Sequence, residues 1–325
     1  MKLHIHGVHV PNRKNTAELA ALRLPIPETV EIPMSMHIGA PAIPVVKPGE
    51  SVRVGQLIGK AGGFVSAPVY ASVSGTVKKI GQQVGSGGRL MQTVVIAADG
   101  KQEPDPDLKP PKLDTMQDFL DAVRESGMVG LGGAGFPTVV KLTVKNLDQI
   151  KCVIINGAEC EPYITGDHRT MLERPEEIIG GAKFLAKMFG VDKVVIGVED
   201  NKQNGIDAMN KVIAEKKAPV VVEPLRCRYP QGGEKQLCQA ITGKQVPPGG
   251  LPANIGCAVF NINTTIAIYH AIKDGMPVVR KVVTVSGSGV VEPKNLECPI
   301  GTPVSLLFDA CGGLKDETFK LIAGG

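Results

Sequence analysis

KCVIIN at Lys151–Asn156 is a continuous apolar run that leads directly into the polar turn GAECEP at Gly157–Pro162. A short apolar run of this kind is typical of a strand buried on both faces. After it, further strands are expected at Lys193–Val198, Pro219–Glu223 and Ala258–Ile262. Helical patterns separate them near 204–216, near 233–242 and up to about Lys273. This alternation predicts right-handed βαβ crossovers and hence an α/β fold with a parallel sheet.

A helix at Pro175–Phe189 is the most strongly marked element of this region. Proline occupies its first turn, Glu176 and Glu177 lie near its positive end, and Gly190 closes it. A second helix is predicted at 115–126, before the sheet.

Residues 41–98 differ in character, because short alternating strands are broken by Gly and Pro, which predicts a small all-β sandwich or barrel. The pattern resembles the barrel-sandwich domains that carry biotin or lipoate on a lysine. Gly62 and Gly63 occupy the turn where that lysine is expected, so we assign the domain a structural role. The charged, Pro-rich stretch 99–114 is predicted to be a linker. From Val282 a third, β-containing unit of about 45 residues begins, and we expect it to be truncated.

Composition narrows the class of protein. The 325 residues carry 36 basic and 32 acidic side chains, a net charge of +4, with no Trp and four Tyr, so a nucleic-acid partner is not expected. No apolar run reaches the length of about 18 residues needed to span a bilayer, and the start has no signal-peptide pattern. Seven scattered cysteines favour a reducing cytoplasm.

GLGGAG at Gly130–Gly135 satisfies the pattern G-x-G-x-x-G, but it follows a helix and not a strand. By itself it can equally be a plain glycine-rich turn. Pro137 can start a helix with Lys141 one turn later, so backbone N–H groups and an ammonium can converge on an anion. A phosphate-binding loop of an unusual kind is therefore plausible.

Polar groups also follow the predicted strands. Asn156, Glu159 and Glu161 come at the end of the first strand, Glu234 follows another, and Asn261 ends a third. Each has an ordinary explanation: a solvated acidic turn, a charge at a helix dipole, an N-cap. Because the carboxyl ends of parallel strands share one edge, these three turns and the glycine-rich loop, four turns in all, are together better explained by a cofactor cleft.

Metal centres have little support. His4, His6 and His9 have no Cys or carboxylate nearby at ligand spacing, so strand histidines are favoured and no metal site is predicted. No C-x-x-C occurs, and the residues supply no recognisable iron–sulfur ligand set.

These segments together resemble the C subunit of the Rnf electron-transport complex and, more distantly, the flavin subunit of respiratory complex I. The resemblance covers the chain from about Ile32 to its last residue. It rests on six motifs: MSMHIGAPAIPVV, GFVSAPVYASVSGTV, GLGGAGFPT with Lys141, INGAECEPYITGDHR, YPQGGEKQL and VPPGGLP.

The resemblance implies an N-terminal segment at 1–34, an all-β barrel-sandwich hybrid domain at 35–100, a linker at 101–114, a Rossmann-like FMN/NADH domain at 115–278 and an incomplete β-grasp domain at 279–325. It implies that FMN is held by Gly130, Gly132, Gly133, Gly135, Lys141, Asn156, Glu159 and Asn261. It implies that NADH is faced by Phe136, Glu161 and Glu234. No catalytic side chain is assigned.

The implied function is an NADH-oxidising electron-entry subunit of an ion-translocating NADH:ferredoxin oxidoreductase. It would be peripheral at the cytoplasmic side of the cell membrane, partnered by other subunits of the complex and indirectly by ferredoxin. Family members carry two [4Fe-4S] clusters in a further domain, so either the protein is longer or a partner holds the clusters. Alternatives are an electron-transfer protein of the same kind serving a soluble reductase, such as proline reductase, and a non-catalytic docking scaffold.

Overall fold

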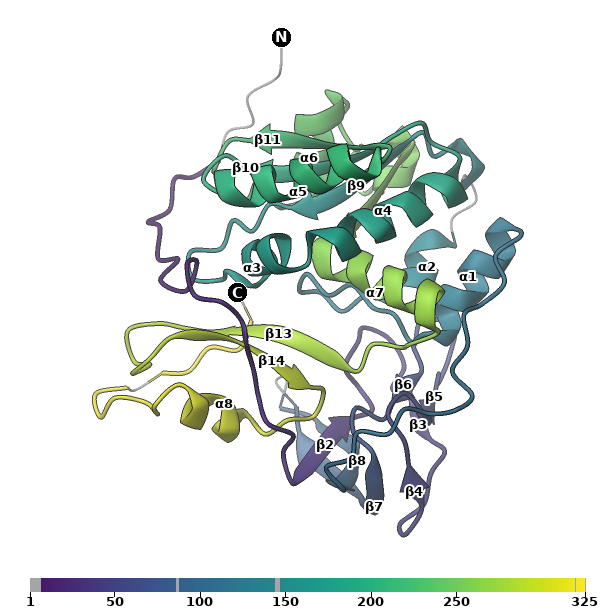
Figure 1. Cartoon of the computed structure of the whole chain (residues 1–325), viewed down its shortest axis with the longest axis vertical. Coiled ribbons are helices and arrows are strands. Elements are labelled where there is room, and N and C mark those ends of the chain that lie inside the picture. Colours follow the sequence, from purple (N-terminus) through teal and green to yellow (C-terminus); the bar gives the residue numbers. More distant parts are fainter. Residues whose placement is uncertain (1–6, 86–87, 144–146, 319, 325) are drawn as a thin grey trace.

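The computed structural model describes residues 7–85, 88–143, 147–318 and 320–324. The prediction for His4 and His6 lies outside these residues. The chain forms a central α/β unit, a small β unit and a third unit in which an antiparallel strand pair is followed by one helix (Figure 1).

The central sheet is parallel, as predicted. It contains β9 (Cys152–Gly157), β10 (Val194–Glu199), β11 (Val220–Leu225) and β12 (Cys257–Asn261), in the spatial order β11-β10-β9-β12. The chain builds outward from β9 to β11 and then returns to place β12 on the other side of β9. The strand order therefore reverses between β9 and β12, and ligands of such sheets bind at this switch point.

Helices cover both faces of this sheet. One face is covered by α1 (Met116–Glu125), α3 (Gly166–Glu173), α4 (Pro175–Phe189), α5 (Gln203–Lys216) and α7 (Ile262–Asp274), and the other by α6 (Glu234–Thr242) and the 3-10 turn η2 (Pro252–Ile255). Along β9, Val153 and Ile155 pack into the first core and Ile154 into the second, as the two-residue strand period requires. The predicted bounds of α4 are confirmed. Helix α3 was not predicted.

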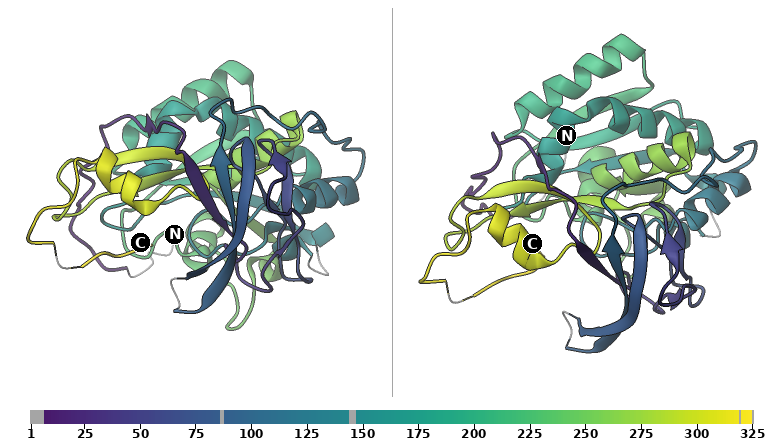
Figure 2. Two further views of the ribbon diagram at one scale, coloured as in Figure 1. Left: turned by 90° about the horizontal axis from the view of Figure 1, so that it is seen from below. Right: turned by 60° about the horizontal axis from the view of Figure 1, so that its bottom comes forward.

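The small β unit consists of two antiparallel sheets around one apolar core. One sheet contains β2 (Thr29–Pro33), β8 (Leu90–Ala98), β7 (Gly75–Val84) and β4 (Ser51–Val52); the other contains β3 (Ile43–Pro44), β5 (Leu57–Lys60) and β6 (Val69–Tyr70). The long hairpin of β7 and β8 extends from the body of the molecule (Figure 2). Because β2 pairs with β8, this unit starts before the boundary predicted at residue 35.

The third unit contains β13 (Arg280–Val285), β14 (Lys294–Pro299) and α8 (Val304–Ala310). The N-terminal segment crosses to it along the side of the central unit, and β1 (Leu22–Arg23) pairs parallel with β14 (Figure 1). A buried polar network joins the third unit to the N-terminal segment and to the central unit, since the Asn295 amide donates to the Thr16 carbonyl at 3.1 Å and to the Thr165 hydroxyl at 2.9 Å. The N-terminal segment thus connects the central unit to the third unit, a role that its sequence did not predict.

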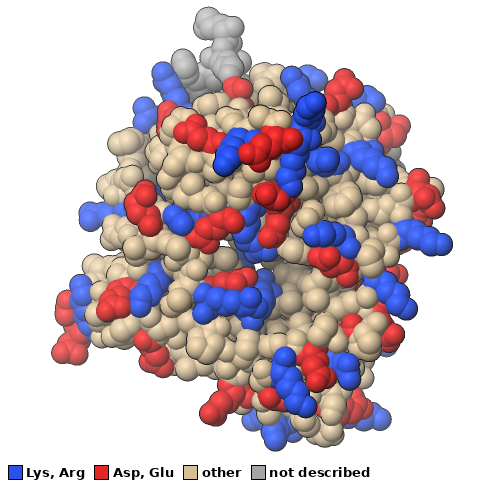
Figure 3. Space-filling view, viewed as in Figure 1, with Lys and Arg blue, Asp and Glu red and all other residues tan. Residues whose placement is uncertain are grey.

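On the face seen in Figure 3, basic and acidic side chains are interspersed. Among the described residues, no helix has the length and apolarity that crossing a membrane requires.

Candidate functional site

The glycine-rich loop is closed at its base. The Gly130 N–H donates to the Phe136 carbonyl at 2.8 Å, and the Leu131 N–H donates to the Thr264 hydroxyl at 3.0 Å, which fixes the loop to the first turn of α7. Among the described residues, the N–H groups of Gly132, Gly133, Ala134 and Gly135 have no hydrogen-bond partner. Such donors are costly to leave unpaired away from water, and a row of them is a natural binding surface for an anion.

A cleft of about 700 Å³ lies beside this loop. It runs along β12, all five of whose residues line it, and Thr138–Leu142 (α2) and the first turn of α6 close its sides. Eight of the predicted site residues are in its wall: Gly130, Gly132, Gly133, Phe136, Lys141, Asn156, Glu234 and Asn261. The four turns that the sequence placed at one edge of the sheet therefore do meet.

Asn156 and Asn261 mark the switch point, because they are register partners at the ends of β9 and β12. The Asn156 amide donates to the Gly232 carbonyl at 2.8 Å, which ties the β9 end to the α6 start. The Asn261 side chain caps α7, accepting from the Asn263 N–H at 2.9 Å, so its ordinary interpretation as an N-cap is correct. It lines the cleft as well.

Lys141 and Glu234 form an ion pair across the cleft. The Lys141 ammonium also donates to the Val259 carbonyl on β12 at 2.6 Å. Both side chains keep about a third of their surface exposed, 33% and 39%. The family resemblance assigns the two residues to different ligands, whereas the structure places them side by side.

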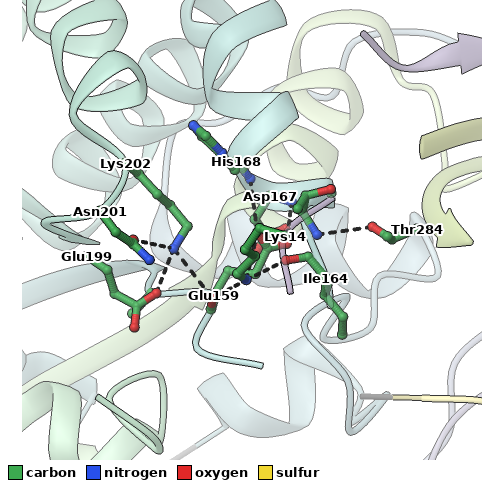
Figure 4. Close-up of polar contacts among 12 residues, drawn as sticks. Lys14, Glu159, Ile164, Asp167, His168, Glu199, Asn201, Lys202 and Thr284 are labelled. Atoms are coloured by element: carbon green, nitrogen blue, oxygen red, sulfur yellow. Dashed lines mark hydrogen bonds and ion pairs between the residues drawn. The ribbon is translucent and has the colours of Figure 1, made fainter. Parts of the chain in front are cut away.

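Glu159 does not reach the cleft. Glu159 is buried outside the cleft wall. Its carboxylate accepts the N–H of Asp167 at 2.8 Å and lies 3.9 Å from the Lys14 ammonium (Figure 4). Burial, reinforced by the nearby Asp167 carboxylate, raises the pKa of Glu159 to about 7.

Glu159 acts on the cleft through Asp167. The Asp167 carboxylate accepts the Asn261 side-chain amide at 2.7 Å and also that of Asn263. Burial raises the pKa of Asp167, and the two amides oppose that shift. Glu159 thus holds Asp167 in place, and Asp167 in turn holds the side chain of Asn261.

A second buried charge pair lies beside this network. Lys202 and Glu199 are 2.6 Å apart, with side chains 2% and 0% exposed, and the Lys202 ammonium also contacts Asn201 at 3.1 Å (Figure 4). Neither this pair nor Lys14 was predicted from the sequence. The only local signal was the i, i+3 spacing of an acid and a base, which occurs on many solvated surfaces.

Two further predicted residues lie outside the cleft wall. The Gly135 carbonyl accepts the Ile38 N–H at 3.1 Å, so this glycine joins the loop to the small β unit. Glu161 is partly buried and is not among the residues that line the cleft.

The residues present fit FMN. The free N–H groups and the Lys141 ammonium suit a phosphate, and a Cβ at Gly133 would meet no atom within 4 Å, so the glycine leaves room for a ligand there. The volume is in the range of about 300–1,000 Å³ usual for ligand pockets. Helix α2 has only five residues, so the predicted contribution of a helix start is small.

Three domain families match the chain. Residues 3–101 match the RnfC barrel sandwich hybrid domain, residues 123–270 match the Nuo51 FMN-binding domain, and residues 282–324 match the SLBB domain. The central unit is thus an FMN-binding domain by family.

Two solved structures of an NAD+-reducing [NiFe]-hydrogenase, in the H2-reduced and air-oxidised states, superpose with TM-scores of 0.51 and 0.52 at 23% identity. They cover 60% and 62% of this chain, and 39% and 40% of the hydrogenase chain. At this identity the likeness concerns the fold alone.

Curated relatives match nearly the whole chain. The C subunit of the proton-translocating ferredoxin:NAD+ oxidoreductase complex of Clostridium ljungdahlii is 44% identical over 98% of this chain and 70% of its own length. Its Na+-translocating counterpart from Acetobacterium woodii is 44% identical over 98% and 73%. The C subunit of the ion-translocating oxidoreductase complex of Rhodobacter capsulatus is 39% identical over 98% and 62%. The chain therefore belongs to the RnfC family, the electron-transfer C subunits of Rnf complexes.

Proposed function

We propose that this chain is the NADH-oxidising, FMN-binding electron-entry subunit of an Rnf-type ion-translocating NADH:ferredoxin oxidoreductase. One observation carries the proposal: a loop of unpaired N–H groups, a lysine and two asparagines converge on a cleft at the switch point of an FMN-binding domain. The names of its relatives, which pair ferredoxin with NAD+, support the same circuit.

In this proposal the unpaired N–H groups of Gly132, Gly133, Ala134 and Gly135, together with the Lys141 ammonium, would hold the FMN phosphate. Asn156 and Asn261, at the two strand ends, would hold the ribityl chain and the ring through hydrogen bonds. Glu159 contributes from behind, by holding Asp167 against Asn261. Bound FMN supplies the exchange between two-electron and one-electron transfer that the protein itself lacks.

The Lys141–Glu234 ion pair indicates that FMN binds first and the dinucleotide second. A phosphate beside Lys141 competes with Glu234 for the ammonium, because an ammonium donates to either anion. Glu234, once released, can accept hydrogen bonds from the ribose hydroxyls of the dinucleotide, with Phe136 in the same wall. Glu161 follows the end of β9 but is not among the residues that line the cleft, and we assign it an electrostatic influence only.

We further propose that the protein is peripheral to the cytoplasmic side of the cell membrane, binds other subunits of the complex and reaches ferredoxin indirectly through [4Fe-4S] clusters. The absence of a membrane-crossing helix among the described residues is compatible with this position.

The test is reconstitution with FMN followed by anaerobic titration with NADH and, in parallel, NADPH. We expect FMN to bind one per chain, and NADH to bleach its absorbance. Failure of the flavin to bind would contradict the site, and binding without bleaching would contradict the NADH-oxidising role. A non-catalytic scaffold would show partner assembly that is independent of FMN content.

A further inference from the structure

Phe64 belongs to the small β unit but lines the cleft of the central unit. It lies in the turn between β5 and β6, and it is 74% exposed, among the most exposed large apolar side chains described. Phe64 shares this wall with Phe136 and Leu251, and apolar side chains that gather in a concave wall commonly mark a binding position.

The turn that carries Phe64 is held by several hydrogen bonds. The Ala40 N–H donates to the Val65 carbonyl at 2.9 Å, and the Ser66 hydroxyl donates to the Ala40 carbonyl at 2.8 Å. The Gly62 N–H donates to the same hydroxyl at 2.9 Å. The phenyl ring is therefore presented by a fixed turn.

The segment beneath this turn is fastened to the glycine-rich loop. The Ile38 N–H donates to the Gly135 carbonyl at 3.1 Å, one residue before Phe136. Next to Ile38, a Cβ on Gly39 would lie 2.0 Å from the Val65 carbonyl oxygen, so only glycine allows these two loop segments to approach so closely. The motif MSMHIGAP thus connects the Phe64 turn to the glycine-rich loop, which gives these residues a structural role.

We propose that Phe64 stacks on a planar ring of the nicotinamide dinucleotide, so that the barrel-sandwich unit supplies part of the dinucleotide site of its neighbour. This inference rests on the part of the proposed function that places a nicotinamide dinucleotide in the cleft, and not on hydride transfer to FMN. The exposure of Phe64 favours a ligand that enters and leaves over a resident flavin, whose phosphate would lie against the glycine-rich loop. The same wall contains further exposed apolar side chains, such as Leu251 at 56%. They extend the surface available to a ring.

The experiment compares Phe64→Ala and Phe64→Trp with Leu90→Ala, a control in the same unit whose side chain is 69% exposed and does not line the cleft. Loss of a ring–aromatic contact is expected to raise the dissociation constant for NAD+ and the KM for NADH by about 5- to 150-fold in Phe64→Ala. The kcat and the FMN content should stay unchanged. Phe64→Trp should retain the affinity, and Leu90→Ala should match the wild type.

Unchanged NAD+ affinity in Phe64→Ala would overturn the inference, and so would a loss of FMN, which would make the flavin the partner of the ring. Because NAD+ titration does not depend on flavin reduction, the two proposals fail separately. If NAD+ binding depends on Phe64 but NADH does not bleach the flavin, the proposed function fails and this inference stands.

Discussion

Replacing Gly133 by alanine should weaken FMN binding strongly, with a modest cost in stability. Gly133 has φ of +142°, and its missing Cβ would meet nothing within 4 Å in the cleft wall. Gly243 offers a matched control, because it has φ of +75°, also meets nothing within 4 Å, and caps the far end of α6. Backbone strain of roughly 1–3 kcal/mol is expected for alanine at each position. Only the methyl group at position 133 enters the ligand site.

The expected loss of FMN affinity in Gly133→Ala follows from the geometry of the loop. A methyl group at position 133 keeps a phosphate away from the neighbouring unpaired N–H groups. Each hydrogen bond to a charged group contributes about 1.5–3 kcal/mol, so the loss of one corresponds to an affinity loss of about 10- to 150-fold. The assay is titration of the apoprotein with FMN, followed by fluorescence, together with urea unfolding of both variants without FMN.

The result that refutes this reasoning is specific. If Gly133→Ala binds FMN as tightly as the wild type, the loop is not the phosphate site. If Gly243→Ala loses FMN to the same extent, strain transmitted through the fold explains the loss, and steric exclusion does not.

Three other predictions test the charged groups. Lys141→Met should raise the FMN dissociation constant by about 10-fold or more, because a charged donor is lost; an unchanged value in the same titration would remove Lys141 from the phosphate site. Lys202→Met should lower the free energy of unfolding by about 3–5 kcal/mol, since Glu199 stays buried and unpaired, whereas adding Glu199→Gln should recover part of the loss; urea unfolding decides. Because the pKa of Glu159 is raised from 4.5 to about 7 on folding, the unfolded chain binds fewer protons in that interval, so apoprotein stability should fall as the pH rises from about 4.5 to 7. The fall is on the order of 3 kcal/mol at most, and Glu159→Gln should flatten the profile; a profile equal to that of the wild type would contradict the assignment.

Much of the fold was predictable, because it depends on local patterns. The proline and acidic start of α4 and its glycine end are properties of adjacent residues, and the structure repeats the predicted bounds. The continuous apolar strands predicted a parallel sheet buried on both faces, and the strand register confirms it. The convergence of the turns on one cleft was also predictable, because the carboxyl ends of parallel strands share an edge.

Other features escaped because they depend on contacts between distant residues. Glu159 and Asn156 are three residues apart at the end of β9, yet one points into the helical layer and the other toward the cleft. The partners of Glu159 include Lys14, 145 residues away in sequence, and no local pattern indicates that approach.

The sequence by itself determined the class of fold, the position of the cleft and the glycine-rich loop that borders it, since these follow from periodicity, turn chemistry and strand direction. Only the tertiary structure decided that Lys141 pairs with Glu234, that Glu159 supports the site from behind, and that Phe64 lines the cleft from a different unit. The physical reason is that these contacts join residues far apart in sequence. Local propensity does not determine which surfaces the folded chain brings together.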